Sequence, residues 1–438
     1  MFQTLKNAWK VEELRNKIWF TLMVIAIYRL GSSIPVPFVD SAMMSAFSQQ
    51  TAGTLFEYMS FLSGEAFSTG TLFALSVSPY ITSSIVMQLL TIALPPLERL
   101  AKEGEEGKKK IAAITRVVTV ALALITAFGY TQLLKVGYNG VSYLSDDSVF
   151  AQIVIIACYC AGASLIMWLA ERINENGIGN GISMILFANI ISRGPALLGS
   201  VWNMVFTNGG FSGFKWTGLL LAILSIAITL AIVVLVVWFT ESERRIPVQY
   251  AKRQVGRKMY GGQTSHLPLK MNMAGVMPII FASSIVSIPA TIAGFITNTE
   301  NWFYKFANNH FNYNTWAYII VYVVLILLFS YFYIMISFNP VEVSNNIKNQ
   351  GGAVPGIRPG KPTAEYIARI LRKITTIGAF FLIFIAAFPM IINLISEGKF
   401  AGLAFGGSSL LIIVGVALET FRTLEAQLSM RNYKGFLD

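Results

Sequence analysis

The sequence predicts an all-α membrane protein in which ten helices cross the bilayer. The chain of 438 residues is 55% hydrophobic and only 13% charged, and its mean hydropathy is +0.61. Soluble globular proteins carry about 25% charged residues, so this composition excludes a water-soluble monomer. Ten stretches approach the roughly 20 apolar residues that a spanning helix needs. They are 18–36, 72–94, 117–134, 150–170, 182–198, 219–239, 274–296, 317–336, 374–395 and 401–421.

The first and last stretches differ from a simple spanning helix. Lys6, Lys10, Arg15 and Lys17 precede the first one, as basic residues precede the apolar core of a signal peptide. No small-residue cleavage site follows it, so we expect a retained helix. The last stretch is rich in Gly at its start and contains Glu419 before its end.

The positive charges predict the orientation of the helices. Of the 33 Lys and Arg residues, 27 lie in the two tails and in the loops on the side of the N-terminus. Cytoplasmic loops carry the excess of Lys and Arg in membrane proteins. We therefore expect both termini in the cytoplasm, with the net charge of +11 concentrated on the cytoplasmic surface.

Ten spans divide into two sets of five, which predicts an inverted repeat. A repeat with an odd number of spans re-enters the membrane from the opposite side. The expected halves are residues 1–200 and 201–438. The second span of each half contains Ser-Ser-Ile-Val, at 83–86 and 283–286. A match this short can also arise by chance, so it only suggests a duplication.

The sequence has no pattern typical of an enzyme or of a metal or cofactor site. The stretch 104–108 resembles part of a phosphate-binding loop but lacks the required spacing. His266 and His310 have no second ligand at metal-binding spacing. Cys158 and Cys160 are too close in sequence to pair well and are typical of small apolar positions. We expect a protein that is not an enzyme and binds no cofactor.

Ionisable residues are nearly absent from the spans. Ion-coupled transporters normally place such residues at membrane depth, whereas here Arg29 and Glu419 lie inside the predicted spans, both towards the ends. A proton- or sodium-coupled pump is therefore disfavoured, and a partner outside the membrane is expected to supply energy.

The second and seventh predicted helices are instead rich in side chains that form hydrogen bonds. Small polar residues commonly pack membrane helices together. They would equally suit an interface between two helices, called the seam, that can separate laterally within the membrane. The candidate seam residues are Ser83, Ser84, Gln88, Ser283, Ser284 and Ser287.

Three connecting segments are unusual. Residues 55–71 are half apolar but too short to span, which fits either an external loop or a re-entrant segment buried in protein. Residues 240–273 and 337–373 form long basic loops, and loops of this length are usually functional. Their charge favours binding to an acidic partner or to an RNA backbone.

Several motifs along nearly the whole chain resemble those of the SecY/Sec61-alpha family, which includes the SecY subunit of the bacterial Sec protein translocase. The similar stretches are 73–90, 102–110, 176–183, 243–250, 266–270, 274–278 and 356–361. The resemblance implies a clamshell of two inverted five-helix halves around a central pore. It also implies a protein-conducting channel that passes unfolded secretory proteins and releases transmembrane segments through a lateral gate.

The resemblance assigns roles to individual residues. A ring of aliphatic side chains would close the pore at Ile81, Ile85, Ile182, Leu186, Ile280 and Ile412. A plug would include Phe61, Leu62, Gly64, Phe67 and Ser68, and the seam residues above would form the lateral gate. The basic loops would dock partners through Arg244, Arg245, Lys252, Arg253, Arg257, Lys258, Arg358 and Lys361.

The resemblance also implies partners and a location. The partners would be the SecE and SecG subunits, the SecA motor ATPase, the ribosome, signal sequences with nascent chains, and membrane lipid. The location would be the bacterial plasma membrane. Two other functions fit the residues alone: an inverted-repeat channel or transporter for small solutes, and a non-conducting scaffold for membrane-complex assembly. The absence of an ionisable site at membrane depth, together with the long basic loops, argues against the transporter.

Overall fold

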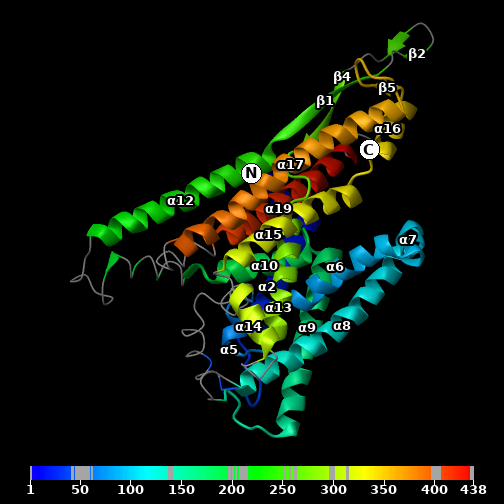
Figure 1. The fold of residues 1–438 in the computed structure, drawn as a ribbon. Coiled ribbons are helices and arrows are strands. Elements are labelled where there is room, and N and C mark those ends of the chain that lie inside the picture. The colour runs from blue at the N-terminus through cyan, green and yellow to red at the C-terminus, as the bar shows by residue number, and fades with distance from the viewer. Residues whose placement is uncertain are drawn as a thin grey trace.

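The computed structural model is a helical bundle in which each of the ten apolar stretches contains a helix (Figure 1). It describes residues 2–434 except 41–43, 45–59, 61–62, 137–141, 196–198, 200–201, 203–204, 207–215, 251–252, 256–257, 261–263, 295–300, 312–314 and 396–405. The ten helices are α2 (Glu12–Gly31), α6 (Ser78–Ala93), α8 (Glu105–Val136), α9 (Val149–Asn176), α10 (Gly181–Ser192), α12 (Trp216–Glu241), α13 (Met277–Gly294), α15 (Trp316–Ser337), α17 (Lys361–Ile395) and α19 (Gly406–Lys434). Among the described residues, five helices are long and apolar enough to cross a membrane, or six when the bent pair α6 and α7 is one span. Shorter helices are α1 (Phe2–Lys10), α5 (Ala66–Thr69), α7 (Pro95–Lys102), α14 (Trp302–His310) and α16 (Pro340–Asn349).

Local sequence explains where several helices begin and end. Asn180 caps α10, because its side-chain oxygen accepts hydrogen bonds from the backbone N–H groups of Ile182 and Ser183. Leu94 ends α6 in an extended conformation, as expected for a residue that precedes proline. The chain then turns by 99° into α7, which places the charged α7 beyond the apolar part of the bundle.

The helices pack in two groups. Helix α8 packs against α6 and α9, and α15 packs against α13 and α17. The two groups meet where α13 contacts α6 and α8, and α10 and α19 pack against each other on another side of the same core. The largest core cluster draws side chains from α6, α10, α13, α15, α17 and α19. The interior therefore lies where the two groups join.

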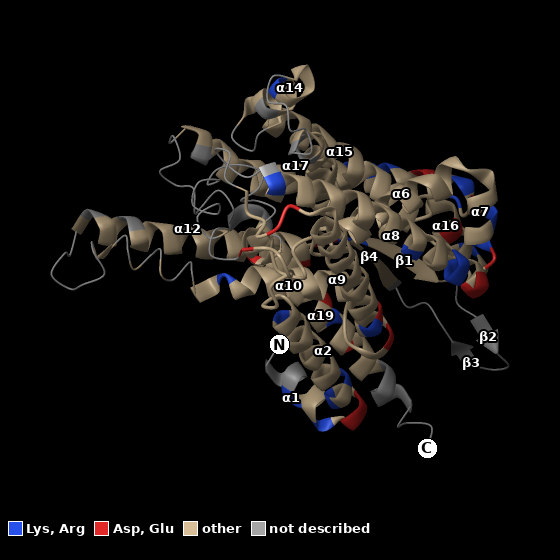
Figure 2. Ribbon diagram, turned by 90° about the horizontal axis from the view of Figure 1, so that it is seen from below, with Lys and Arg blue, Asp and Glu red and all other residues tan. Residues whose placement is uncertain are grey.

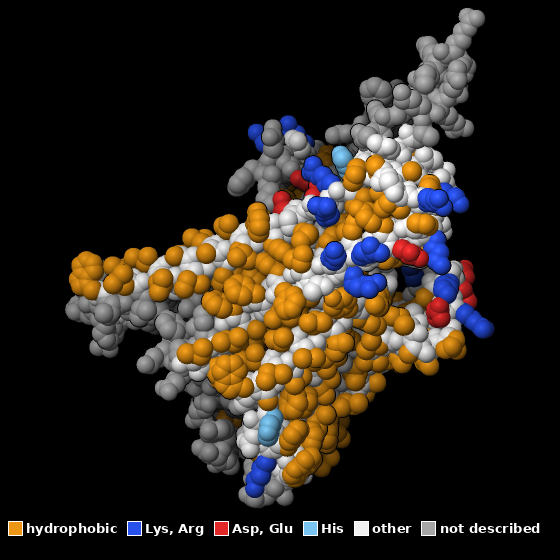
Figure 3. Space-filling model, turned by 45° about the horizontal axis from the view of Figure 1, so that its top comes forward, with side chains coloured by type: hydrophobic (Ala, Val, Ile, Leu, Met, Phe, Trp, Pro, Cys, Tyr) orange, Lys and Arg blue, Asp and Glu red, His pale blue; other side chains and the backbone are white. Residues whose placement is uncertain are grey.

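The outer surface of the bundle is apolar and its ends are charged. Hydrophobic side chains cover most of the face shown in Figure 3, and Trp238 on α12 is 72% exposed. Figure 2 shows Lys and Arg residues gathered around α1, α7 and α16, with few along the middle of the helices. An apolar band between charged ends matches the hydrocarbon core of a bilayer.

Among the described residues, five short strands occur in the segments predicted as basic loops, and the sequence did not predict them. Strand β1 (Glu243–Tyr250) lies between β4 (Thr264–Lys270) and β5 (Gly352–Ala353), and both pairings are antiparallel. Strands β2 (Arg253–Val255) and β3 (Lys258–Tyr260) pair separately. Because β5 comes from the second loop, the two loops form one structural unit.

Close backbone approach at Gly162 generates a prediction about folding. A Cβ atom added there would lie 2.1 Å from the carbonyl oxygen of Leu72, so the Gly162→Ala variant must push α9 away from the segment that leads into α6. We expect a loss of about 1–3 kcal/mol of stability, measured as a lower temperature at which purified protein leaves its monodisperse chromatography peak. The control is Gly194→Ala, because no atom of the described residues lies within 4 Å of a Cβ at that position. Equal behaviour of the two variants would contradict this packing account.

Candidate functional site

A small cavity lies at the junction of four helices in the interior of the bundle. Four of the six predicted ring residues line it together, each from a different helix: Ile81 of α6, Leu186 of α10, Ile280 of α13 and Ile412 of α19. The other lining residues are Ser76, Ser78, Ile279, Ser283 and Ser284. The structure therefore brings together ring residues that are up to 331 positions apart in the sequence.

The cavity is narrow and its walls are largely aliphatic. Its volume is about 20 Å³, which is enough for about one water molecule. The four ring residues that line it are each no more than 7% exposed. The aliphatic part of this wall offers no ligand that could replace the hydration shell of an ion, and the four serines supply its polar part.

Two predicted ring residues lie outside the cavity wall. Ile85 is buried in the surrounding core, and the half-buried Ile182 packs against that core. Each is one helical turn away from a residue that lines the cavity, Ile81 on α6 and Leu186 on α10. The cavity is thus shallow along the helix axes, because one turn advances a helix by about 5.4 Å.

The predicted seam residues lie on the two helices that meet beside the cavity, α6 and α13. Ser83 is fully buried and donates a hydrogen bond to the carbonyl oxygen of Thr115 on α8, at 2.8 Å. On α13, Ser283 and Ser284 both donate to the carbonyl oxygen of Ile280 in their own helix, at 2.9 Å. The hydroxyl groups of these three serines therefore do not join α6 to α13.

The remaining predicted seam residues lie on the same two helices. Ser84 and Gln88 are half buried on α6. Ser287 donates to the carbonyl oxygen of Ser284 at 2.8 Å. The structure thus places all six predicted seam residues on helices that contact each other.

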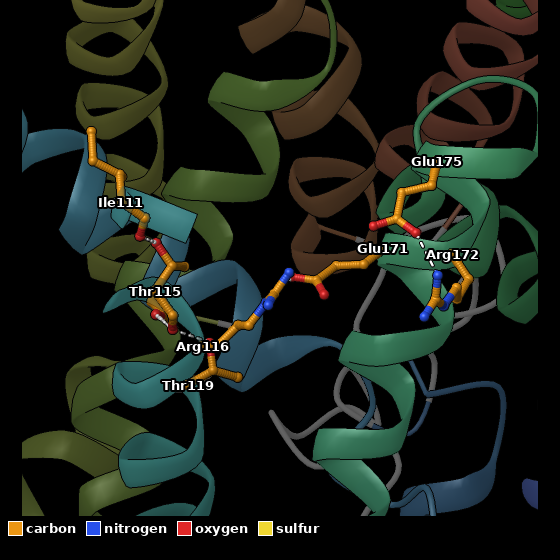
Figure 4. A network of polar contacts seen from close by, with 8 residues as sticks. Ile111, Thr115, Arg116, Thr119, Glu171, Arg172 and Glu175 are labelled. Carbon is orange, nitrogen blue, oxygen red and sulfur yellow. Dashed lines mark hydrogen bonds and ion pairs between the residues drawn. The ribbon is translucent and has the colours of Figure 1, made fainter. Parts of the chain in front are cut away.

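Polar contacts bind α6, α8 and α9 into one unit. Besides the Ser83 bond, Arg116 of α8 pairs with Glu171 of α9 at 2.8 Å. Figure 4 shows the Arg116 side chain reaching across to Glu171, with Arg172 and Glu175 paired on α9 nearby. These bonds orient the three helices with respect to one another, and α13 lies against the α6 and α8 side of this unit.

The predicted plug segment includes the short helix α5 and the residues before it. Phe67 is buried against the ring of Tyr130 of α8, and the Tyr130 hydroxyl donates a hydrogen bond to the Phe67 carbonyl oxygen. Ser68 is buried and accepts a hydrogen bond from Ser60 at 2.9 Å. Figure 1 places α5 at the end of the bundle away from the strands. Phe61 and Leu62 lie outside the described residues.

The structure surrounds the plug segment with polar residues that the sequence did not single out. Arg193, Asn189 and Ser192 come from the end of α10 and its C-terminal cap. Arg29, at the end of α2, also belongs to this group and, like Arg193 in the stretch 182–198, is a charge inside an apolar stretch. The others gave no signal because α10 is otherwise apolar and reaches the plug only in the folded chain.

The basic residues predicted to dock partners lie on the unit formed by the two loops. Arg244 and Arg245 are exposed on β1, and Arg245 pairs with Glu243 at 2.6 Å. Arg358 and Lys361 are exposed, and the Arg358 carbonyl oxygen accepts a hydrogen bond from Thr363. Arg253 and Lys258 belong to β2 and β3, whereas Lys252 and Arg257 lie outside the described residues.

A hydrophobic core holds this unit together beneath its charged surface. Ile246 and Val248 of β1 pack with Leu269 of β4, Ile347 of α16 and Ile367 of α17. Partial burial lowers the pKa of the Lys270 ammonium group at the end of β4, and the nearby Arg422 lowers it further. The unit is therefore an ordered platform for the side chains of Arg244, Arg245, Arg358 and Lys361.

Comparison with known proteins identifies the family. The SecY family profile matches residues 71–421. Protein translocase subunit SecY of Streptomyces scabiei is 42% identical over 445 residues, covering 100% of both chains. Two solved structures share the fold at low sequence identity. One describes the plug domain of the SecY protein as stabilising the closed state of the translocation channel, with a TM-score of 0.60, 17% identity and coverage of 94% of this chain and 92% of the other. The other is Sec61 in the canine ribosome-channel complex from the endoplasmic reticulum, with a TM-score of 0.59, 16% identity and the same coverage.

These matches confirm the ten-helix fold and decide between the functions that the sequence left open. Full-length similarity to translocase subunits excludes the small-solute transporter and the non-conducting scaffold. The chain belongs to the SecY family and is the non-enzymatic, channel-forming subunit of a membrane-embedded protein translocase.

Proposed function

We propose that the cavity lined by Ile81, Leu186, Ile280 and Ile412 is the closed constriction of the protein-conducting pore. The observation that carries this proposal is the convergence of four aliphatic side chains from four helices around a space of about 20 Å³. Aliphatic side chains make no specific demand on a passing peptide, and their rotamers can adjust around different residues. Ile85 and Ile182, one turn away, would extend the seal along the pore axis.

We further propose that the interface of α13 with α6 and α8 is the lateral gate. Ser83 binds α6 to α8, while Ser283 and Ser284 bond within α13. The gate would therefore open by moving the α6, α8 and α9 unit away from α13. The halves 1–200 and 201–438 would be the two sides of this clamshell, and the segment around α5 would be the plug.

The platform formed by the two basic loops would dock the partners that drive translocation. Its exposed Arg and Lys side chains suit the ribosome, as in the ribosome-bound Sec61 structure, or the acidic surface of the SecA motor ATPase. SecE and SecG would pack as further subunits against the apolar outer surface, with lipid covering the rest. The positive charges favour both termini in the cytoplasm. The similarity to bacterial relatives favours the bacterial plasma membrane.

The constriction is tested by making it polar. Replacing Ile81 and Ile280 together by Ser should wet the cavity, so that purified protein in a planar bilayer conducts ions at rest while export of a signal-bearing protein persists. The matched control replaces Ile326 and Ile385, which are buried in the same core but do not line the cavity. A resting conductance equal to that of the wild type in folded protein would contradict the assignment.

The gate is tested by a crosslink across the seam. Cysteines introduced at Ser84 and Ser283 should form a disulfide or a short chemical crosslink that stops export, because α6 can no longer leave α13. A crosslink between cysteines at Ser83 and Thr115 is the control, since α6 and α8 move together in this account. Export that continues through the Ser84–Ser283 crosslink would contradict the gate.

Docking is tested by reversing one charge on the platform. Arg358→Glu should reduce ATP-dependent translocation by about tenfold, as expected when a charge at an interface becomes repulsive. Folding should be unchanged, because exposed charges contribute little to stability. Arg172→Glu, an exposed reversal on α9, is the control. Normal translocation by the Arg358 variant would argue against a docking role.

A further inference from the structure

We propose that Glu65 and Arg193 form an electrostatic latch that holds the plug segment closed, with Arg29 as a second cation beside it. This inference rests on the plug proposed above and assigns the residues that position it. The Arg193 Nε atom lies 3.3 Å from the Glu65 carboxylate, and the two side chains are 22% and 50% exposed. The ion pair joins the plug segment directly to the end of α10.

The backbone around Glu65 is built to present this side chain. Gly64 and Glu65 both have positive φ angles, 63° and 75°. Glycine tolerates this left-handed conformation, whereas a residue with a side chain adopts it at a cost in free energy. Residues held in such conformations cluster at functional sites. The Glu65 N–H donates to the Ser60 carbonyl oxygen, and its own carbonyl oxygen accepts from Ser68 and Thr69, which fixes the turn.

Gly64 lies directly against Arg29, Asn189 and Ser192, which together form the socket of the plug segment. A Cβ atom at this position would lie 2.8 Å from Arg29 Nη1, and 3.1 Å from both Asn189 Oδ1 and Ser192 Oγ. Arg29 Nη1 is buried and has no hydrogen-bond acceptor among the described residues. Its positive charge therefore lies beside the turn that carries the negative charge of Glu65, with Arg193 as the direct partner of that charge.

The socket is connected to the constriction through α10. Asn189 Nδ2 donates a hydrogen bond to Ser76 Oγ at 3.4 Å, and Ser76 lines the cavity at the constriction. Leu186, which also lines the cavity, lies one turn before Asn189 on the same helix. A chain that parts the constriction moves α10 or the Ser76 segment, and either movement shifts the residues that hold Glu65. Opening of the pore and release of the plug are thereby coupled.

The test is a double-mutant cycle read as resting ion conductance of purified channel in planar bilayers. E65Q and R193Q each remove one charge with little change in shape, and each should raise the fraction of time spent conducting by about fivefold. The double variant should conduct no more than either single variant, because one interaction is lost in all three. R193K retains the charge and should stay within about twofold of the wild type. The matched control is E175Q, which removes the acid of an exposed ion pair to Arg172 at 2.7 Å.

Deletion of residues 61–68 separates failure of the latch from failure of the plug. A deletion that conducts at rest, together with E65Q and R193Q at the level of the wild type, would overturn the latch and leave the plug intact. Independent, additive effects of the two variants would also overturn it, since they would show two separate structural roles. A deletion that does not conduct would overturn the plug and the latch with it.

Discussion

The proposed gate depends on one interaction, the hydrogen bond from Ser83 to the backbone of Thr115. It ties α6 to α8 inside an apolar core, and Arg116 ties α8 to α9 through Glu171. The serines of α13 that face the cavity bond to their own helix instead. Interhelical hydrogen bonds in membranes contribute about 0.6–2 kcal/mol each, so their placement decides where a bundle separates first. In the proposed gate, the contact of α13 with α6 and α8 is therefore the interface that an apolar signal helix would replace.

The proposed constriction and the plug segment depend on different physical interactions. In the proposed constriction, the four aliphatic side chains exclude ions because they offer no ligand for them, and this holds for any arrangement that keeps these side chains close. The plug segment is held by directional contacts: an aromatic pair at Phe67, the Tyr130 hydrogen bond and the ion pair of Glu65. Ser76 and α10 contribute to both regions, so a peptide that widens the proposed constriction would also disturb the contacts of the plug segment.

The sequence predicted the helices well because spanning segments are specified by apolar length alone. It placed all ten, and its resemblance to the SecY family supplied residues such as Leu186 and Ile412 that the fold brings to one cavity. Composition could not predict that Ile85 and Ile182 lie outside the cavity wall, since that depends on which turn of each helix faces it. Strand β1 was missed because its alternation covers only a few residues among charges that suggested an exposed loop. Arg193 and Asn189 were missed because their significance arises from a contact between segments far apart in the chain.

In the proposed gate, α6 leaves α13 while remaining with α8. Spin labels placed in pairs at Val86 and Ile288, and at Val86 and Val117, report the two distances, and all three side chains are exposed. Pulsed dipolar spectroscopy on channels arrested with a signal-bearing precursor should show the α6–α13 distance increase relative to the idle channel, while the α6–α8 distance stays the same. An unchanged α6–α13 distance, or an equal increase in both, would contradict the account.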